Sequence, residues 1–277
     1  MARYLSPIPL YRSIMEENMP DCMIESTLQV CNGNLVVNGN WIKINSKINI
    51  LAYGKASRLM YKAAKKIISN EYFGKGLLIT HEDKKIQEID GTRESVIKST
   101  HPLITKSSYI AGNKAKEFVE NGHGDDILLV LISGGGSAMV ALPIDSISLS
   151  DKIKFISTVM HMSVPEREVN VLKKALSKIK GGKLAELATE QTIVNCVLSD
   201  ERDHQISAIS SGMTVCNKLI DPIDVMDTYK LWDVAENPVK KALIDHGCVT
   251  GIGCDKNIIN QIVGSRDTLM ASFVKRY

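Results

Sequence analysis

The sequence predicts an α/β fold: a doubly wound, mainly parallel sheet of the Rossmann-like kind, with helices on both faces. Two observations support this prediction. Apolar runs typical of strands alternate with amphipathic stretches typical of helices along the 277 residues, as in parallel sheets covered on both sides. The run ILLVLIS at 127–133 does not alternate between apolar and polar residues, so we expect a strand buried on both faces. We expect a single domain over residues 1–277.

Each element follows from a local pattern. Residues 8–30 have apolar side chains at helical intervals broken at Pro20, which predicts one or two helices, and Asn38-Gly39 predicts a hairpin between 35–38 and 41–43. Ser148 and Asp151 have the spacing of a capping box at the start of a helix. Further strands are expected at 48–53, 76–81, 95–100, 127–133 and 192–198, and helices at 59–68, 107–121, 149–162, 166–179 and 229–246, the last broken or kinked at Pro238.

Composition and charge exclude several classes of protein. The net charge is only +3 and the lysines are spread along the chain, which argues against a nucleic-acid partner. No apolar run approaches the roughly 18 residues of a membrane span, so we expect no membrane association. The six cysteines form no CxxC pair, which predicts reduced thiols and a cytoplasmic protein.

The most informative segment follows the strand predicted at 127–133. In sheets of this kind, ligands bind outside the carboxyl ends of the strands. Glycine amides without a Cβ, flanked by hydroxyl groups, can form a site for a phosphate or a carboxylate. The alternative is a tight turn that needs glycine for its geometry alone. The residues of this candidate anion site are Ser133, Gly134, Gly135, Gly136 and Ser137.

Lys55 follows Gly54 at another strand end and opens a predicted helix. A cation is unfavourable beside the positive pole of a helix, so stability alone does not explain a lysine at this position. An ammonium directed at a phosphoryl oxygen does explain it. The alternative is one more solvated surface lysine.

Two more strand ends have side chains suited to catalysis or binding. Residues 200–204, after the strand at 192–198, are all ionisable, and the carboxylates of Asp200 and Asp203 are oxygen ligands of the kind that Mg²⁺ accepts. The alternative is a solvated loop. His101 ends the strand at 95–100 and is a candidate for ligand binding, although a lone histidine is more often structural.

The helix predicted at 166–179 has polar residues outside its apolar stripe. Glu168, Asn170 and Lys173 are candidates to contact a ligand at the edge of the sheet, together with Lys180, and Gly181-Gly182 allows a close backbone approach. The alternative is a solvated basic face.

Together these motifs resemble the N-terminal domain of the glycerate 2-kinases, the class II family with two domains. The likeness covers nearly the whole chain in the order of the family, and LSKIKGGKLA together with SGGGSA is its most specific part. The residues that carry it are YGKAS at 53–57, THP at 100–102, LISGGGSAM at 131–139, EVN at 168–170, LSKIKGGKLA at 176–185, LSD at 198–200, SSGMT at 210–214 and IVGS at 262–265.

The resemblance implies ATP-dependent phosphorylation of glycerate or a similar small hydroxy acid, with Mg²⁺. It implies that Lys55 contacts phosphate or acts in catalysis, and that Asp200 is the acidic residue of the site, holding Mg²⁺ or accepting the hydroxyl proton. The family's second domain does not follow residue 277, so we expect it to be a separate polypeptide, to be replaced by a homodimer, or to be lost from a degenerate kinase. The other functions left open are a non-catalytic anion- or nucleotide-binding subunit and a sugar-phosphate isomerase that uses Glu168 or His101 as its base.

Overall fold

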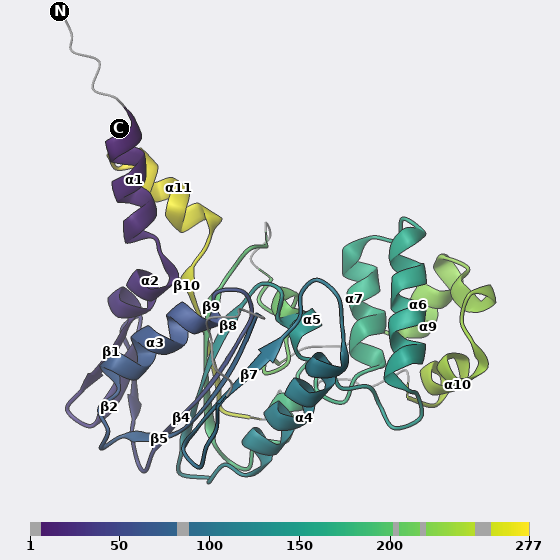
Figure 1. Cartoon of the computed structure of the whole chain (residues 1–277), viewed down its shortest axis with the longest axis horizontal. Helices are drawn as coiled ribbons and strands as arrows, with labels where there is room; N and C mark the ends of the chain where they lie inside the picture. The colour runs from purple at the N-terminus through teal and green to yellow at the C-terminus, as the bar shows by residue number, and fades with distance from the viewer. Residues whose placement is uncertain (1–6, 82–88, 202–204, 217–219, 247–255, 277) are drawn as a thin grey trace, which may run out of the picture.

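The computed structural model describes residues 7–81, 89–201, 205–216, 220–246 and 256–276. Its centre is a seven-stranded sheet in the order β10-β9-β8-β4-β5-β7-β6 (Figure 1). Its six pairings are parallel except for that of β6 with β7. The strands are β4 (Ile48–Tyr53), β5 (Phe73–His81), β6 (Ile89–Asp90), β7 (Glu94–Ser99), β8 (Ile127–Ser133), β9 (Thr192–Leu198) and β10 (Ile258–Gly264).

The strand order contains one reversal, and it lies between β4 and β8. From β4 the chain adds β5 and β7 on one side of the sheet, and then returns to add β8, β9 and β10 on the other. The carboxyl ends of β4 and β8 therefore lie side by side, with Tyr53 opposite Ile132 in the register. Such a reversal is where doubly wound sheets bind their ligands, so the segments that follow these two strands are the place to look for a site.

Each face of the sheet is covered by a separate apolar core, as the strand at 127–133 predicted. Alternate side chains of β4 and β8 enter opposite cores because successive residues of a strand point to opposite faces. One face packs against α2 (Pro20–Thr27), α3 (Ser57–Ile67) and a three-stranded antiparallel sheet of β1 (Leu28–Cys31), β2 (Asn34–Val37) and β3 (Asn40–Lys43). The other packs against α4 (Lys106–Glu120), α5 (Gly136–Met139) and α8 (Lys183–Glu186). The prediction of a doubly wound α/β sheet is confirmed.

A group of helices stands beside the sheet and has a core of its own (Figure 1). We call it the helical lobe: α6 (Leu149–His161), α7 (Glu166–Ala175), α9 (Pro222–Thr228), a 3-10 turn (Leu231–Asp233) and α10 (Asn237–His246). A second 3-10 turn, Ile209–Ser211, lies against α5 and β8. At the opposite side, α1 (Pro7–Glu17) and α11 (Arg266–Val274) lie next to each other, joined by an ion pair between Arg276 and Glu17.

Some predicted boundaries are wrong, whereas the breaks predicted at the two prolines are confirmed. Residues 28–31 form β1 rather than the end of a helix, because this segment pairs with β2 and buries Leu28. The breaks predicted at Pro20 and Pro238 are present: each proline lies in the first turn of a new helix, α2 or α10, where a missing backbone N–H costs nothing. Helix α7 stops at Ala175, four residues earlier than predicted. The strands at 48–53, 127–133 and 192–198 and the capping box of Ser148 and Asp151 are confirmed.

The cysteines only partly match the prediction of reduced thiols. Cys22, Cys31 and Cys196 are free, and burial raises the pKa of the Cys196 thiol to about 12. Cys216 is disulfide-bonded, so the prediction is wrong at this residue; spacing along the chain does not reveal which cysteines meet in space. None of the helices in the described ranges combines the length and the apolarity that crossing a membrane requires.

Candidate active site

A cavity of about 670 Å³ lies between the carboxyl ends of the central strands and the helical lobe. Residues that follow β4, β7, β8 and β9 form one side, which we call the rim: Lys55, His101, Gly134, Gly135 and Asp200. Residues of α6 and α7, together with Lys180, form the other side, which we call the lysine wall: Lys152, Lys173, Lys174 and Lys180.

Lys55 is held at the rim by the backbones of two neighbouring strand ends. Its amide donates to the carbonyl of Gly134 (2.9 Å), and the amide of Ala56 donates to Ser133 Oγ (3.0 Å). Gly54 is left-handed (φ +114°), and a Cβ at that residue would lie 2.4 Å from the Ser133 carbonyl oxygen. Glycine is therefore required for β4 and β8 to approach this closely and place Lys55 beside Gly134 and Gly135, which we call the glycine turn.

The glycine turn is short of side chains because its neighbours pack directly on the backbone. A Cβ at Gly134 would lie 1.8 Å from Asp200 Oδ2, and one at Gly135 would lie 2.9 Å from the His101 ring and 3.0 Å from Lys55 Cγ. Lys55 Nζ is 3.5 Å from Asp200 Oδ2, and both side chains are about half exposed. Three strand ends thus bring an ammonium, a carboxylate and an imidazole together over Gly134 and Gly135.

The surroundings of His101 favour the neutral form of its imidazole, because they lower its pKa. Burial is the largest cause that lowers its pKa below the ordinary value of 6.5, followed by the charges of Lys55 and His81. The carboxylate of Asp200 acts in the opposite direction and is the smallest of these influences. A neutral imidazole offers one donor and one acceptor nitrogen to a ligand at the rim.

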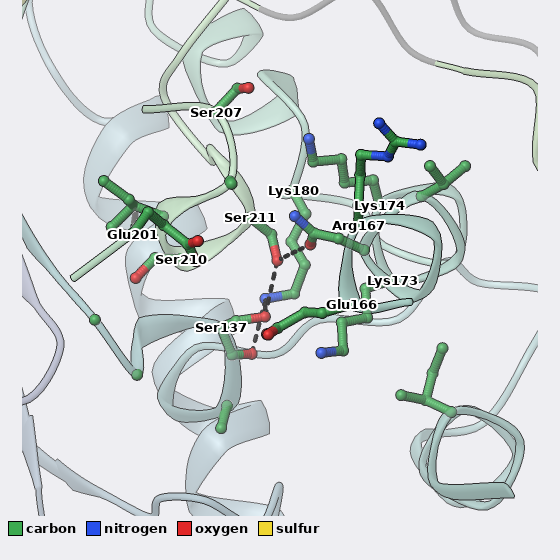
Figure 2. A pocket seen from close by; sticks show the side chains of 18 of the residues that line it. Ser137, Glu166, Arg167, Lys173, Lys174, Lys180, Glu201, Ser207, Ser210 and Ser211 are labelled. Carbon is green, nitrogen blue, oxygen red and sulfur yellow. Dashed lines mark hydrogen bonds between the residues drawn. The ribbon is translucent and has the colours of Figure 1, made fainter. Parts of the chain in front are cut away.

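A chain of hydrogen bonds crosses the floor of the cavity (Figure 2). Lys180 Nζ donates to the Ser137 carbonyl (2.8 Å) and to Ser137 Oγ (3.1 Å). Ser137 Oγ and Ser211 Oγ are 2.8 Å apart, and Ser211 Oγ donates to Asn170 Oδ1 (2.7 Å). Each hydroxyl has one hydrogen, so Ser137 donates to Ser211, and the direction of the whole chain is set from Lys180 to Asn170.

The turn that supplies Ser211 has an unusual backbone. Ser210, Ser211 and Gly212 are all left-handed, with φ of 51°, 62° and 56°. Two consecutive non-glycine residues in this region cost of the order of 1–3 kcal/mol each, so the surrounding contacts must hold them there. Ser210 Oγ donates to the Ser133 carbonyl (2.8 Å), and the amide of Gly181 donates to the Ser211 carbonyl (2.9 Å). These bonds fix the turn against both the glycine turn and the Gly181-Gly182 segment.

Several lysine side chains of the wall are buried. Lys152 and Lys180 are each only 1% exposed and Lys174 is 9% exposed. Burial lowers the pKa of Lys152 to about 7 and that of Lys174 to about 8, and the pKa of Lys180 falls well below its ordinary value for the same reason. The charges of neighbouring lysines add to the effect at Lys152 and Lys180. Burial also lowers the pKa of Lys173, which Glu166 partly restores.

Cationic side chains outnumber acidic ones around the cavity. The permanently or potentially cationic residues that line it are Lys55, Lys152, Arg167, Lys173, Lys174 and Lys180, besides His101. The acidic residues that line it are Glu166, Asp200 and Glu201. A cavity with this balance favours an anionic ligand.

The described residues do not form a metal cage, since they contain no group of three or more His, Cys, Asp or Glu side chains placed to share an ion. Asp200 offers one carboxylate at the rim. Mg²⁺ in phosphoryl-transfer sites is usually held by one or two carboxylates plus the phosphates of the substrate, so a single carboxylate fits that arrangement.

Comparison with known proteins places the chain in a family. A family profile described as a domain of unknown function (DUF4147) matches residues 9–244. The chain belongs to this family. Relatives include a glycerate 2-kinase from Pyrococcus horikoshii (29% identical over 78% of this chain and 48% of the relative) and a D-glycerate 2-kinase from Thermotoga maritima (26% identical over 86% and 53%). The resemblance to glycerate 2-kinases predicted from the motifs is confirmed.

Two solved structures share the fold of this DUF4147 chain. A crystal structure of a Pyrococcus horikoshii protein superposes with a TM-score of 0.86 at 25% identity, covering 97% of this chain and 62% of that one. The glycerate kinase of Thermotoga maritima gives a TM-score of 0.80 at 23% identity, over 96% and 59%. The chain spans about half the length of the glycerate kinases whose sequences it matches.

The structure brings most of the predicted site residues of this family member to the cavity, but not all of them. Ser133 and Gly136 are buried behind the turn and do not line it. Glu168 does not line it either: it lies two residues, or about 200° around the helix, from Asn170, and pairs with Arg167 at 3.0 Å. Asp203 lies outside the described residues. Those that do line the cavity are Lys55, His101, Gly134, Gly135, Ser137, Asn170, Lys173, Lys180 and Asp200.

Sequence reasoning missed Lys152, Lys174 and Ser211. A signal for the two lysines was present, because each falls in an apolar stripe: position 152 precedes Phe155, Ile156 and Val159 at helical spacing, and all are buried. A lysine in such a stripe is either satisfied internally or faces a cavity. Ser211 gave no local signal, because its role depends on a left-handed turn that the sequence does not specify.

Proposed function

We propose that this chain supplies the phosphoryl-transfer site of a glycerate kinase, which moves the γ-phosphoryl group of ATP to a hydroxyl of glycerate. The convergence of Lys55, Asp200 and the glycine turn at the reversal of the strand order carries this proposal. The names of the relatives support the choice of glycerate as the acceptor.

The roles follow from charge and position. In the transfer, a glycerate oxygen forms a bond to the γ-phosphorus, the bond from that phosphorus to the β–γ bridging oxygen breaks, and ADP leaves. Lys55 neutralises the charge on the transferred group, and the amides near Gly134 and Gly135 bind a phosphate oxygen or the carboxylate of the acid. Asp200, next to Lys55, is placed to accept the proton of the attacked hydroxyl or to serve as a metal ligand.

Mg²⁺ is part of the same proposal. Asp200 and the phosphates of ATP would hold it, and the ion would offset the negative charge of those phosphates. The protein's own contribution is to orient the two reactants. The rim contacts the transferred group. The floor beneath it consists of Ser137, Ser211 and Asn170, whose side chains are held in fixed orientations by hydrogen bonds.

A coupled assay of ADP release, with and without D-glycerate, tests the proposal. We expect ADP release that depends on D-glycerate, either from the chain alone or after addition of the second α/β domain of a two-domain relative as a separate polypeptide. Formation of phosphoglycerate, detected by mass spectrometry, confirms the acceptor. ADP release that ignores D-glycerate under both conditions contradicts the proposed function.

The alternative is a non-catalytic subunit that binds an anion or a nucleotide. Its support is that the chain matches only about half of each two-domain relative. On this alternative, ATP binds to the chain with measurable affinity but no phosphoglycerate forms in either arm of the assay.

A further inference from the structure

Lys174 is the least explained residue of the cavity. It is 9% exposed, it lines the cavity, and its Nζ has no hydrogen-bond or ion-pair partner within the described part of the chain. Figure 2 shows Lys173 and Lys174 on the same helix, with their side chains extending in different directions along the cavity. Most of the side chain is buried, which lowers the pKa of its amine to about 8, and the amine is open to an anionic ligand in the cavity.

The other buried lysines are satisfied by backbone carbonyls. Lys152 Nζ donates to the Leu176 carbonyl (2.7 Å), and Lys183 Nζ donates to the carbonyls of Ser177 (2.7 Å) and Lys174 (3.0 Å). Lys180 Nζ has the Ser137 and Val140 carbonyls. These three lysines therefore make structural bonds, whereas no partner for the amines of Lys174 and its neighbour Lys173 lies among the residues that the structure describes.

Asn170 adds donors at the same wall. Its Oδ1 accepts from Ser211, at the end of the chain of hydrogen bonds that begins at Lys180. That direction leaves the two N–H groups of Asn170 Nδ2 as the unused end of the amide. Asn170 lies one helical turn before Lys173 and Lys174, so donors and amines share one face of α7.

The charge of this wall points to more than one negative charge on the ligand. Lys173 and Lys174 both line the cavity, and among the acidic residues that line it only Glu166 belongs to α7. A monoanionic carboxylate would offset one of these charges. A polyphosphate chain offers several anionic oxygens, and the cavity volume of about 670 Å³ is ample for one beside a small acid.

We propose that Lys173 and Lys174, with the Asn170 amide, form a polyphosphate subsite that holds the phosphate chain of a nucleoside triphosphate. The inference rests on the proposed kinase function for the identity of the nucleotide. It divides the cavity: the phosphate chain lies along α7, with its terminal phosphate toward Lys55, and the small acid occupies the rim.

Binding of sodium tripolyphosphate, measured by isothermal titration calorimetry on the full chain at about pH 7, tests the subsite without turnover. We expect Lys174→Met to weaken the binding of tripolyphosphate and of ATP roughly tenfold or more, as for loss of one charge-assisted hydrogen bond. Lys178→Met is the matched control, since Lys178 pairs with Asp145 and does not line the cavity. Inorganic phosphate should bind more weakly than tripolyphosphate.

Lys173→Met provides a second variant at a less buried position, and we expect a similar loss; if Lys174→Met fails to fold, as seen by circular dichroism, Lys173→Met decides alone. Wild-type affinity for tripolyphosphate in the folded variants, or no binding to the wild-type chain, would overturn the inference.

The inference and the proposed function fail separately. If tripolyphosphate binding depends on Lys173 and Lys174 but no phosphoglycerate forms, the subsite stands and the kinase proposal falls. If phosphoglycerate forms and the Lys174→Met variant has an unchanged KM for ATP, the kinase proposal stands and the subsite falls.

Discussion

The lysines of the rim and of the lysine wall differ in solvent exposure and in pairing. At the rim, Lys55 is about half exposed and lies 3.5 Å from a carboxylate, so its charge is both solvated and paired. At the wall, the side chains of Lys152, Lys174 and Lys180 are buried, and burial depresses the pKa of each. From this difference we infer that the rim acts on the transferred phosphoryl group. The wall binds the remaining negative charge of the ligand.

The largest effect is expected at the rim. Lys55→Ala should lower phosphoryl transfer about a thousandfold or more, because it removes the ammonium that offsets charge on the transferred group. The fold should persist, since the side chain is half exposed. Lys62→Ala, an exposed lysine of α3, is the control for the loss of a positive charge. Turnover of Lys55→Ala close to wild type, by the coupled assay, would exclude the role of Lys55.

Crowding the glycine turn should produce the next largest effect. In Gly134→Ala, the new methyl group meets the Asp200 carboxylate, so Asp200 must move away from Lys55. We expect turnover to fall about a hundredfold, the cost of misplacing a reacting group by about 1 Å.

Gly124→Ala is the matched control for that change, because a Cβ there meets only ordinary contacts at 3.5 Å. Equal turnover of the Gly134 and Gly124 variants would show that the position of Asp200 does not matter for the transfer.

At the wall, pH should affect stability. The folded-state pKa of Lys152 is about 7, against an ordinary 10.5, so between these values the unfolded chain binds more protons than the folded one. The contribution of Lys152 to the free energy of unfolding therefore rises with pH from about 7 to about 10. Urea unfolding of the ligand-free chain at about pH 7 and about pH 9 should show a smaller rise for Lys152→Met than for wild type. If the free energy of unfolding rises equally with pH in the variant and the wild type, the pKa of Lys152 is not lowered in the folded chain.

The smallest effect is expected outside both regions. Glu168→Gln should change turnover and tripolyphosphate affinity less than about twofold, because the ionic partner of Glu168 among the described residues is the exposed Arg167 and its carboxylate does not line the cavity. A larger loss of turnover or affinity would show that the face of α7 with Glu168 takes part in binding or catalysis, contrary to this account.

The same comparison shows how far the sequence leads. The rim was predictable because it depends on topology: once strands at 48–53, 127–133 and 192–198 are recognised in a parallel sheet, their carboxyl ends must meet, and Lys55, Gly134 and Asp200 come together. The wall was not, because Lys174 becomes a site residue only through the way α7 packs within the helical lobe and faces the cavity. Glu168 was chosen from the right helix but the wrong face, since the helix was predicted without its orientation to the sheet.

A crystal structure of the chain with adenylyl imidodiphosphate, a non-hydrolysable ATP analogue, tests the central claim most directly. We predict phosphate oxygens within hydrogen-bond distance of Nζ of Lys173 and Lys174, with the terminal phosphate approaching Nζ of Lys55. A triphosphate bound outside this cavity, or Lys55 turned away from the terminal phosphate, would contradict the account.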